Sequence, residues 1–198
     1  MASSIDQPAS IRDHAAENLR FIREAMERAG SVTVIPGAGI VFIGITAIGA
    51  AWIASRQIRP EIWLGVWMIE LMVAIAADTV ATVRKARRTG VALLGTPFRR
   101  FLFSFSVPMF VGGLLTLVFH RHELYSSMPA LWLLLYGTAI VNGGLFSIRI
   151  VPVMGLSFIA LGIVAAVSPS IDGDIFMAAG FGVLHIVFGS IIARRHGG

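Results

Sequence analysis

The chain contains no cysteine, and only 14% of its 198 residues are charged. The missing thiols exclude disulfide bonds, thiolate metal sites and iron–sulfur clusters. No nucleophile–base constellation, phosphate-binding loop or metalloprotease motif occurs either, so the sequence predicts neither an enzyme nor a bound cofactor. What the chain has instead is 56% hydrophobic residues, a composition typical of a membrane protein.

Long apolar segments make up most of the chain. A transmembrane helix needs about 20 mainly apolar residues to cross about 30 Å of hydrocarbon, and six segments are close to that length: 33–54, 62–83, 101–119, 129–148, 150–168 and 174–193. The third segment contains Pro108 well inside it, which predicts a kink. We therefore predict an all-α integral membrane protein, with a six-span domain over residues 31–198. Because the first 30 residues are charged and helical in pattern, we expect no cleavable signal peptide before the first span.

The spacing of prolines favours three helical hairpins. The first helices would begin near Pro36, Pro108 and Pro152, and the second helices at Pro60-Glu-Ile-Trp63, at Pro129-Ala-Leu-Trp132 and, more weakly, at Gly173-Asp-Ile-Phe176. Two-span units of one topology would be related by an axis along the membrane normal. Proline is also common in the first turn of unrelated helices, so chance similarity is an equal alternative to a true internal repeat.

Basic residues are unevenly distributed between the two sides of the predicted membrane. With the N-terminus inside, only Arg56, Arg59 and Arg121 of the 16 Lys and Arg residues fall in outer loops. The positive-inside rule then predicts a cytoplasmic (inner) membrane with both termini in the cytoplasm. This topology accounts for the net charge of +5, so no nucleic-acid partner is predicted. The run Arg84-Lys85-Ala-Arg87-Arg88 is a stop-transfer flank that can also contact anionic lipid.

Residues 1–30 are predicted to form a cytosolic tail and an amphipathic helix over about 11–29. The charges of this helix cancel, whereas a helix that binds an anionic bilayer surface is usually more basic. We therefore expect it to dock on protein: on this chain's own inner face, on a second copy in a homo-oligomer, or on a cytosolic partner. The docking residues would be Ile11, Leu19, Ile22 and Met26 of its apolar stripe.

Three ionisable side chains lie inside the predicted spans: Glu70 and Asp78 in the second and His185 in the sixth. Each costs about 2.5–3.5 kcal/mol or more at mid-depth, so such groups normally face protein or a water-filled cavity. Glu70 and His185 lie at similar depth on stripes of small residues, which predicts that the second and sixth spans pack together with these two groups in contact. The pair would either titrate protons in a solute pathway or form a structural hydrogen bond.

Two further groups of polar residues are weaker candidates. Asn142, before Gly143 and Gly144, marks either a break in the fourth span beside a solute pathway or a close helix contact. His120, His122 and Glu123 carry zinc-ligand atoms at the outer end of the third span. Their short run lacks the spacing of a metal site, and a solvated loop is the preferred interpretation.

The Pro- and Gly-rich first and last spans superficially resemble those of the acetate/succinate channel family. The overlap covers Pro36–Thr46 and Ala179–Ile191, but the family's Asn-Pro-Ala-Pro-Leu-Gly stretch is missing and Ile35-Pro36-Gly-Ala-Gly39 stands in its place. We therefore predict neither membership of that family nor acetate-type transport.

Two functions of different classes follow from the sequence. One is a small-solute or ion channel or transporter, oligomeric, with Glu70, Asp78, His185 and Asn142 on or beside its path. The other is a non-transporting membrane subunit or sensor that docks a cytosolic partner through the N-terminal helix. A hydrated cavity that reaches Glu70 would indicate transport, and a dry bundle would indicate the subunit.

Overall fold

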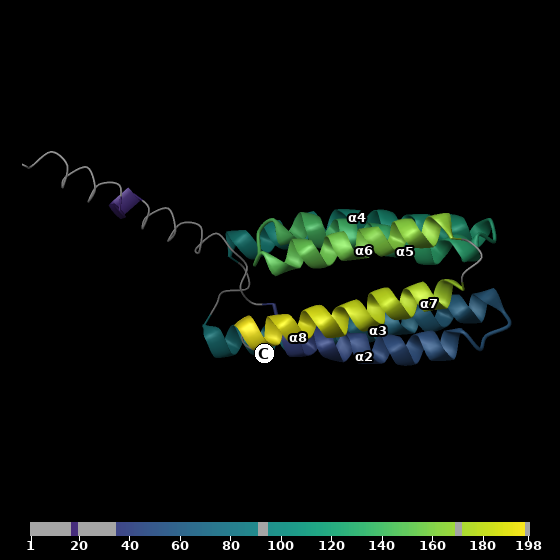
Figure 1. Ribbon diagram of the computed structural model, residues 1–198, viewed down its shortest axis with the longest axis horizontal. Helices are drawn as coiled ribbons and strands as arrows, with labels where there is room; N and C mark the ends of the chain where they lie inside the picture. The colour runs from purple at the N-terminus through teal and green to yellow at the C-terminus, as the bar shows by residue number, and fades with distance from the viewer. Residues whose placement is uncertain (1–16, 20–34, 91–94, 169–171, 197–198) are drawn as a thin grey trace, which may run out of the picture. The chain divides into compact units, whose positions relative to one another are not determined.

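The computed structural model describes residues 17–19, 35–90, 95–168 and 172–196 (Figure 1). The chain divides into two compact units, Met1–Ser31 and Val32–Gly198, and the second holds the apolar helices. The described residues form helices and no strand, which confirms the all-α prediction for that part of the chain. Five of these helices are long and apolar enough to cross a membrane.

Four of the five are single α-helices: α2 (Gly37–Ala54), α3 (Pro60–Thr89), α4 (Thr96–Arg121) and α6 (Ile150–Val167). The fifth, Gly173–Arg195, combines α7 (Gly173–Met177), a π-helical segment η2 (Ala178–Leu184) and most of α8 (His185–His196). The predicted fourth span, 129–148, corresponds to α5 (Met128–Gly144), which directly follows the 3₁₀ turn η1 (Tyr125–Ser127). With 17 residues, α5 is about 26 Å long.

Proline and glycine set several of these helix ends. Proline stands in the first turn of α3, α4 and α5, where its missing N–H removes no helical hydrogen bond. The last residue of α3 is followed by Gly90, whose φ of 68° is the left-handed conformation that terminates many helices. Pro108 lies inside α4, and the helix continues on both sides of it.

The helices of the second unit form two layers (Figure 1). In one layer α5 packs against α4 and α6, and in the other α2 packs against α3 and α8. The first two predicted hairpins, α2–α3 and α4–α5, therefore each lie within one layer. The third does not, because α6 packs mainly on α5 while α8 packs mainly on α2. The three hairpins are not equivalent in packing, and the internal repeat stays a prediction.

Glycines bring the helices of each layer into close contact. A Cβ at Gly155 of α6 would lie 2.8 Å from the carbonyl oxygen of Gly137 on α5, and a Cβ at Gly44 of α2 would lie 2.7 Å from that of Gly182 in η2. Backbones can approach this closely only where side chains are absent. Four glycine pairs seven residues apart share this role: 37 and 44, 137 and 144, 155 and 162, and 182 and 189.

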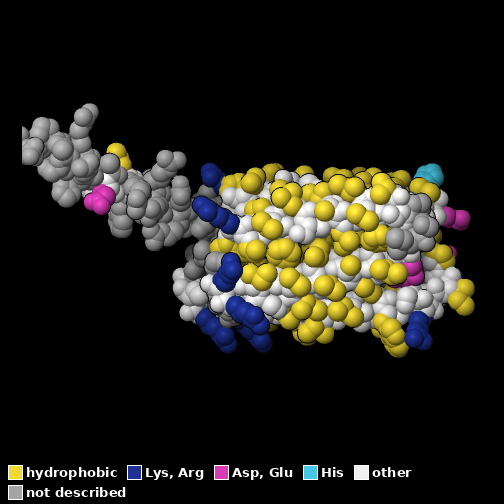
Figure 2. Space-filling model, viewed as in Figure 1, with side chains coloured by type: hydrophobic (Ala, Val, Ile, Leu, Met, Phe, Trp, Pro, Cys, Tyr) yellow, Lys and Arg dark blue, Asp and Glu magenta, His cyan; other side chains and the backbone are white. Residues whose placement is uncertain are grey.

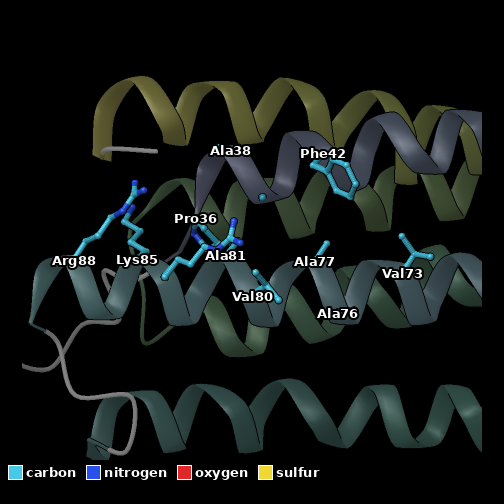
Figure 3. A pocket seen from close by; sticks show the side chains of 12 residues that line it. Pro36, Ala38, Phe42, Val73, Ala76, Ala77, Val80, Ala81, Lys85 and Arg88 are labelled. Carbon is cyan, nitrogen blue, oxygen red and sulfur yellow. The ribbon is translucent and has the colours of Figure 1, made fainter.

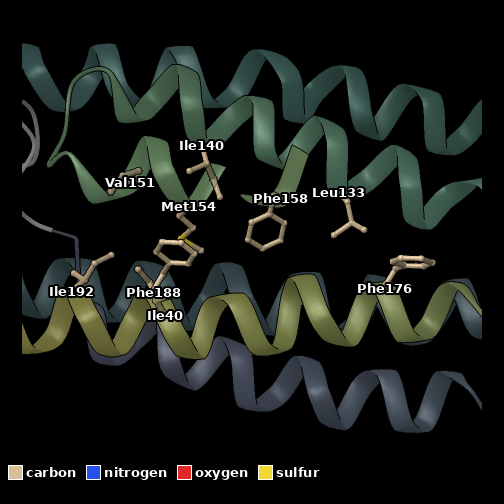
Figure 4. Close-up of a cluster of buried hydrophobic side chains, with 9 residues drawn as sticks. All are labelled: Ile40, Leu133, Ile140, Val151, Met154, Phe158, Phe176, Phe188 and Ile192. Atoms are coloured by element: carbon tan, nitrogen blue, oxygen red, sulfur yellow. The ribbon is translucent and has the colours of Figure 1, made fainter. Parts of the chain in front are cut away.

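Large apolar side chains fill the space between the two layers (Figure 4). Leu133 of α5, Phe158 of α6 and Ile192 of α8 have no exposed surface. The cluster also includes Ile40, Ile140, Val151, Met154, Phe176 and Phe188. Packing between the layers therefore rests on aliphatic and aromatic side chains from both, and it positions the polar groups described next.

Candidate functional site

The most deeply buried ionisable side chain of the described residues is His185, which is 2% exposed. It is the first residue of α8, directly after the π-helical segment η2. Its Nε2 lies 2.7 Å from the hydroxyl oxygen of Tyr136 on α5, so one hydrogen bond joins the two layers. Either the hydroxyl donates to a neutral Nε2, or a protonated Nε2 donates to the hydroxyl oxygen.

Aromatic rings surround this hydrogen bond. The Tyr136 ring centroid lies 4.9 Å from that of Phe158 and 5.1 Å from that of Phe181, and Phe158 also meets the His185 imidazole edge-on at 5.3 Å. Such tilted and edge-on arrangements are the favourable ones for aromatic rings. The backbone of Gly180 and Phe181 interacts with the imidazole, but Nδ1 has no hydrogen bond of normal geometry.

Asp78 of α3 interacts electrostatically with this group. Protein surrounds much of the carboxylate, yet the residue retains exposed surface, so it is accessible from outside the packed core. The Tyr136 hydroxyl is the group with which it interacts, and Tyr136 as a whole residue is half-buried. Exposure therefore falls from Asp78 through Tyr136 to His185. These residues come from α3, α5 and α8, and we call them the polar array.

Glu70 has a different partner from the predicted one. Its Oε1 accepts a hydrogen bond from Thr46 Oγ1 of α2 at 2.7 Å, whereas His185 pairs with Tyr136. Both α3 and α8 pack mainly against α2. The predicted contact between Glu70 and His185 is therefore wrong. The small residues beside His185 do make a close helix contact, but they make it with α2.

Asn142 is half-buried on α5, and within the described residues its side chain forms no hydrogen bond. The helix runs through it and ends at Gly144. A Cβ at Gly144 would lie 2.9 Å from the ring of Pro152 on α6. The glycines that follow Asn142 thus serve the close helix contact, which was the alternative to a break beside a pathway.

The candidate metal ligands at the outer end of α4 are not gathered. His120 Nδ1 lies 2.7 Å from the Tyr125 hydroxyl, while His122 and Glu123 are exposed. No group of three or more His, Asp or Glu side chains that could hold a metal ion occurs in the described part of the chain. Of the docking residues, Leu19 is 68% exposed, and Ile11, Ile22 and Met26 lie outside the described residues.

Two tryptophans form a clamp between the layers that sequence reasoning did not anticipate. The rings of Trp63 on α3 and Trp132 on α5 stack with centroids 5.5 Å apart at an interplanar angle of 9°. Trp63 Nε1 donates to Asp174 Oδ1 of α7 at 2.7 Å, and Trp132 Nε1 donates to Thr116 Oγ1 of α4 at 2.8 Å. The sequence placed both tryptophans at a membrane boundary, but it did not indicate that they meet.

A groove of about 670 Å³ runs between α2 and α3 (Figure 3). Its walls are mostly apolar, and its basic end carries Arg84, Lys85 and Arg88. The Lys85 ammonium donates to the carbonyl oxygen of Ile35 at 2.9 Å, which holds the start of α2 beside α3. The remaining lining residues are Pro36, Ala38, Gly39, Phe42, Val73, Ala76, Ala77, Val80 and Ala81.

Comparison with known proteins does not assign the chain to a family. No protein-family model, curated protein or solved structure matches the chain. Any functional conclusion therefore rests on the residues and contacts described above.

Proposed function

We propose that the chain is a non-transporting membrane subunit or sensor. Its polar array begins at the exposed residue Asp78 and ends at His185, which is buried inside the bundle. The observation that carries this proposal is the fall in exposure from Asp78 through Tyr136 to His185. A transporter binds its solute near the bilayer midplane and opens that site to either side in turn. Here the innermost group of the array is enclosed by aromatic rings instead.

The burial of apolar side chains of the bundle supports this enclosure of His185. Leu133 and Phe158 have no exposed surface, and Met177 is 1% exposed. The clamp formed by Trp63 and Trp132 joins the layers at the same end of the bundle as α7. A polar group that is reached from one side and closed on the other suits the detection of a proton or ligand better than its passage.

The proposal includes six membrane spans: the five candidate spans described above and, between α4 and α6 in the chain, α5. α5 packs against α4 and α6, both long enough to span, and its length of about 26 Å is close to the hydrocarbon thickness of about 30 Å. Lys and Arg side chains gather at the end of the bundle where α3 and α8 terminate (Figure 2). By the positive-inside rule this end, and with it both termini, faces the cytoplasm of an inner membrane.

A homo-oligomer is also part of the proposal. Among the spanning helices α3 and α4 have the smallest buried share, and large side chains such as Phe103 and Phe110 are more than 70% exposed. Lipid can cover these apolar side chains. Asp78 is different, because the residue retains exposed surface and an ionisable group inside a membrane needs a polar partner or water. A second copy on that side of α3 and α4 would supply enclosed polar surroundings.

The residue range 1–30 is the proposed contact with a cytosolic partner. The chain divides between Met1–Ser31 and Val32–Gly198, and this division supports an N-terminal module that can act on another protein. In this arrangement the bundle would respond to conditions in the membrane, and the N-terminal unit would transmit the response.

A second candidate, a proton-coupled transporter of a small solute, is favoured by one specific observation. Asp78 is accessible and its charge acts on Tyr136, which is hydrogen-bonded to His185. Chains of titratable groups form proton relays in pumps and transporters. On this alternative, Glu70 would not take part, because it is bonded to Thr46 at a different helix contact.

Proton flux into proteoliposomes that contain a trapped pH-sensitive dye separates the two candidates. We expect the purified protein to give the same flux as protein-free liposomes under an imposed pH gradient and membrane potential. The variants Asp78→Asn and His185→Leu should then change nothing, and Glu70→Gln serves as the matched carboxylate control. A flux above the protein-free level that Asp78→Asn abolishes and Glu70→Gln retains would overturn the proposal in favour of transport.

A further inference from the structure

We propose that the groove between α2 and α3 binds an anionic phospholipid, with the phosphate at Arg84 and Arg88 and one acyl chain along the apolar walls. This inference rests on the proposal that the helices span a bilayer. It adds a ligand of defined chemistry and a site that is separate from the polar array.

The basic end of the groove is suited to a phosphate group. Arg84 and Arg88 are four residues apart on α3, so they lie on one face of the helix, and both are exposed. Within the described residues neither guanidinium has a carboxylate in ion-pair contact. Guanidinium groups bind phosphate through paired, charge-assisted hydrogen bonds. Lys85, by contrast, is bonded to Ile35 and has a structural role at the floor of the groove.

The walls of the groove are suited to an acyl chain. A hollow exists here because the side chains that face each other across the two helices are small, as at Ala38, Ala76 and Ala77. At Gly39 the helices touch, since a Cβ there would lie 2.7 Å from that of Ala81. The larger lining residues are Phe42, Val73 and Val80, which are apolar and partly exposed.

The length of the groove matches one leaflet of a bilayer. Arg84 and Val73 are eleven positions apart on α3, or about 16 Å at the helical rise. Half of the hydrocarbon core is about 15 Å thick. The hydrogen bond between Thr46 and Glu70 lies roughly one turn beyond Val73, and so polar groups mark the outer end of the apolar walls.

Charge decides between a lipid and a second copy of the chain as the occupant. A helix from another copy would cover Arg84 and Arg88, and burying two unpaired charges is costly unless the partner supplies carboxylates. An anionic headgroup brings the opposite charge to the membrane surface, where polybasic clusters attract such lipids. The second copy proposed above would lie instead on the side of α3 that carries Asp78.

The test is a lipid titration of the full-length protein followed by native mass spectrometry. Phosphatidylglycerol and phosphatidylcholine with the same acyl chains are compared for the wild type and for a variant carrying both Arg84→Gln and Arg88→Gln. Arg87→Gln is the matched control, because Arg87 is an exposed arginine of the same run that does not line the groove. A second pair tests the walls: Ala77→Phe fills the groove, and Ile75→Phe adds bulk at an exposed position outside it.

We expect the wild type to bind phosphatidylglycerol more tightly than phosphatidylcholine. Each arginine near an anionic headgroup contributes about fivefold to affinity, so the double variant should bind phosphatidylglycerol about 30-fold more weakly. Arg87→Gln should stay within about twofold of the wild type on the same scale. Ala77→Phe should weaken the binding of both lipids, while Ile75→Phe should weaken neither. Inorganic phosphate at millimolar concentration should not displace the lipid, because it cannot occupy the apolar walls.

Several results would overturn the proposal. These are equal affinity of the wild type for the two lipids, an equal loss in Arg87→Gln, displacement by inorganic phosphate alone, or unchanged binding in Ala77→Phe. Disulfide cross-linking between two copies through Val80→Cys would mean that protein covers the groove. Folding of each variant is checked by circular dichroism, and if Ala77→Phe does not fold, the exposed arginine pair decides alone. Membrane insertion is measured separately by cysteine labelling, so a correctly inserted protein that fails to select lipid counts against the groove only.

Discussion

The hydrogen bond between Tyr136 and His185 gives the sharpest test of how the two layers are held together. Tyr136→Phe keeps the ring contacts with Phe158 and Phe181 but removes the hydrogen-bond partner of His185 Nε2. His185→Leu removes the imidazole and leaves the Tyr136 hydroxyl without this partner. Combining both changes removes both ends of the bond, so the double variant should lose less stability than the two single variants together.

The expected size of this coupling comes from two ranges. A buried partner left unsatisfied costs about 1–3 kcal/mol in water-soluble proteins, whereas hydrogen bonds between membrane helices average about 0.6 kcal/mol and reach about 1.7 kcal/mol. Because His185 is 2% exposed and its other nitrogen has no bond, we expect a value in the upper part of the membrane range, about 1–1.7 kcal/mol.

The measurement is a double-mutant cycle on the free energy of unfolding in mixed micelles. Thr46→Val serves as the control, because Thr46 bonds to Glu70 and shares no hydrogen-bond partner with Tyr136. Its effect should add to that of Tyr136→Phe within about 0.5 kcal/mol. A coupling between Tyr136 and His185 that is no larger than this control would refute the assigned hydrogen bond.

Three further predictions concern other parts of the chain. Gly155→Leu should lower the free energy of unfolding by about 1–3 kcal/mol or more, because its Cβ would meet the α5 backbone at 2.8 Å. Gly113→Leu is the control and should have little effect, because Gly113 has open space around it. Equal losses of stability in the two variants would contradict the close contact at Gly155. Asp174→Ala should lower the free energy of unfolding by about 1–3 kcal/mol and shift the tryptophan fluorescence, since it removes the acceptor of the Trp63 indole N–H. If neither the emission spectrum nor the stability changes, the clamp is contradicted. Deletion of residues 1–28 should leave a folded, helical bundle that elutes as a single species, and loss of the folded species would show that this unit belongs to the core.

The positions of the helices could be predicted because apolar runs, and proline or glycine at helix ends, are local signals in the sequence. The predicted second span ends at 83, whereas α3 continues to Thr89. The extra turns hold the basic run, because Lys, Arg and Ala favour a helix outside the hydrocarbon as well as inside it. The turn residue Gly90 then ends the helix.

The partners of the helices could not be predicted from the same signals. Small residues beside His185 correctly indicate a close helix contact, but such a stripe does not identify the opposing helix. The glycine spacing of seven does carry some of this information, because it recurs on the helices that meet: α2 with η2–α8, and α5 with α6. A comparison of glycine spacings across all spans would have favoured these pairs over a contact between the second and sixth spans.

The polar array depended on contacts that sequence patterns do not encode. Tyr136 lies 49 positions before His185, and nothing around it distinguishes it from the aromatic residues of a membrane boundary. The π-helical segment before His185 was also not predictable, since its sequence is as apolar as that of the α-helices around it. Depth and helical face identified Glu70, Asp78 and His185 as residues of interest, and the packing of the layers determined their partners.

Cysteine accessibility is the most direct measurement of the central claim that the polar array ends blindly in a packed bundle. Because the chain contains no cysteine, single cysteines can be placed at Leu133, which has no exposed surface, at Thr89 and at Ser126. Each is challenged from both sides of oriented vesicles with a charged, membrane-impermeant thiol reagent. We expect labelling of Thr89→Cys only from the cytoplasmic side, labelling of Ser126→Cys only from the opposite side, and no labelling of Leu133→Cys from either. Labelling of Leu133→Cys at a rate comparable to the two controls would reveal an aqueous path through the bundle and refute a closed polar array.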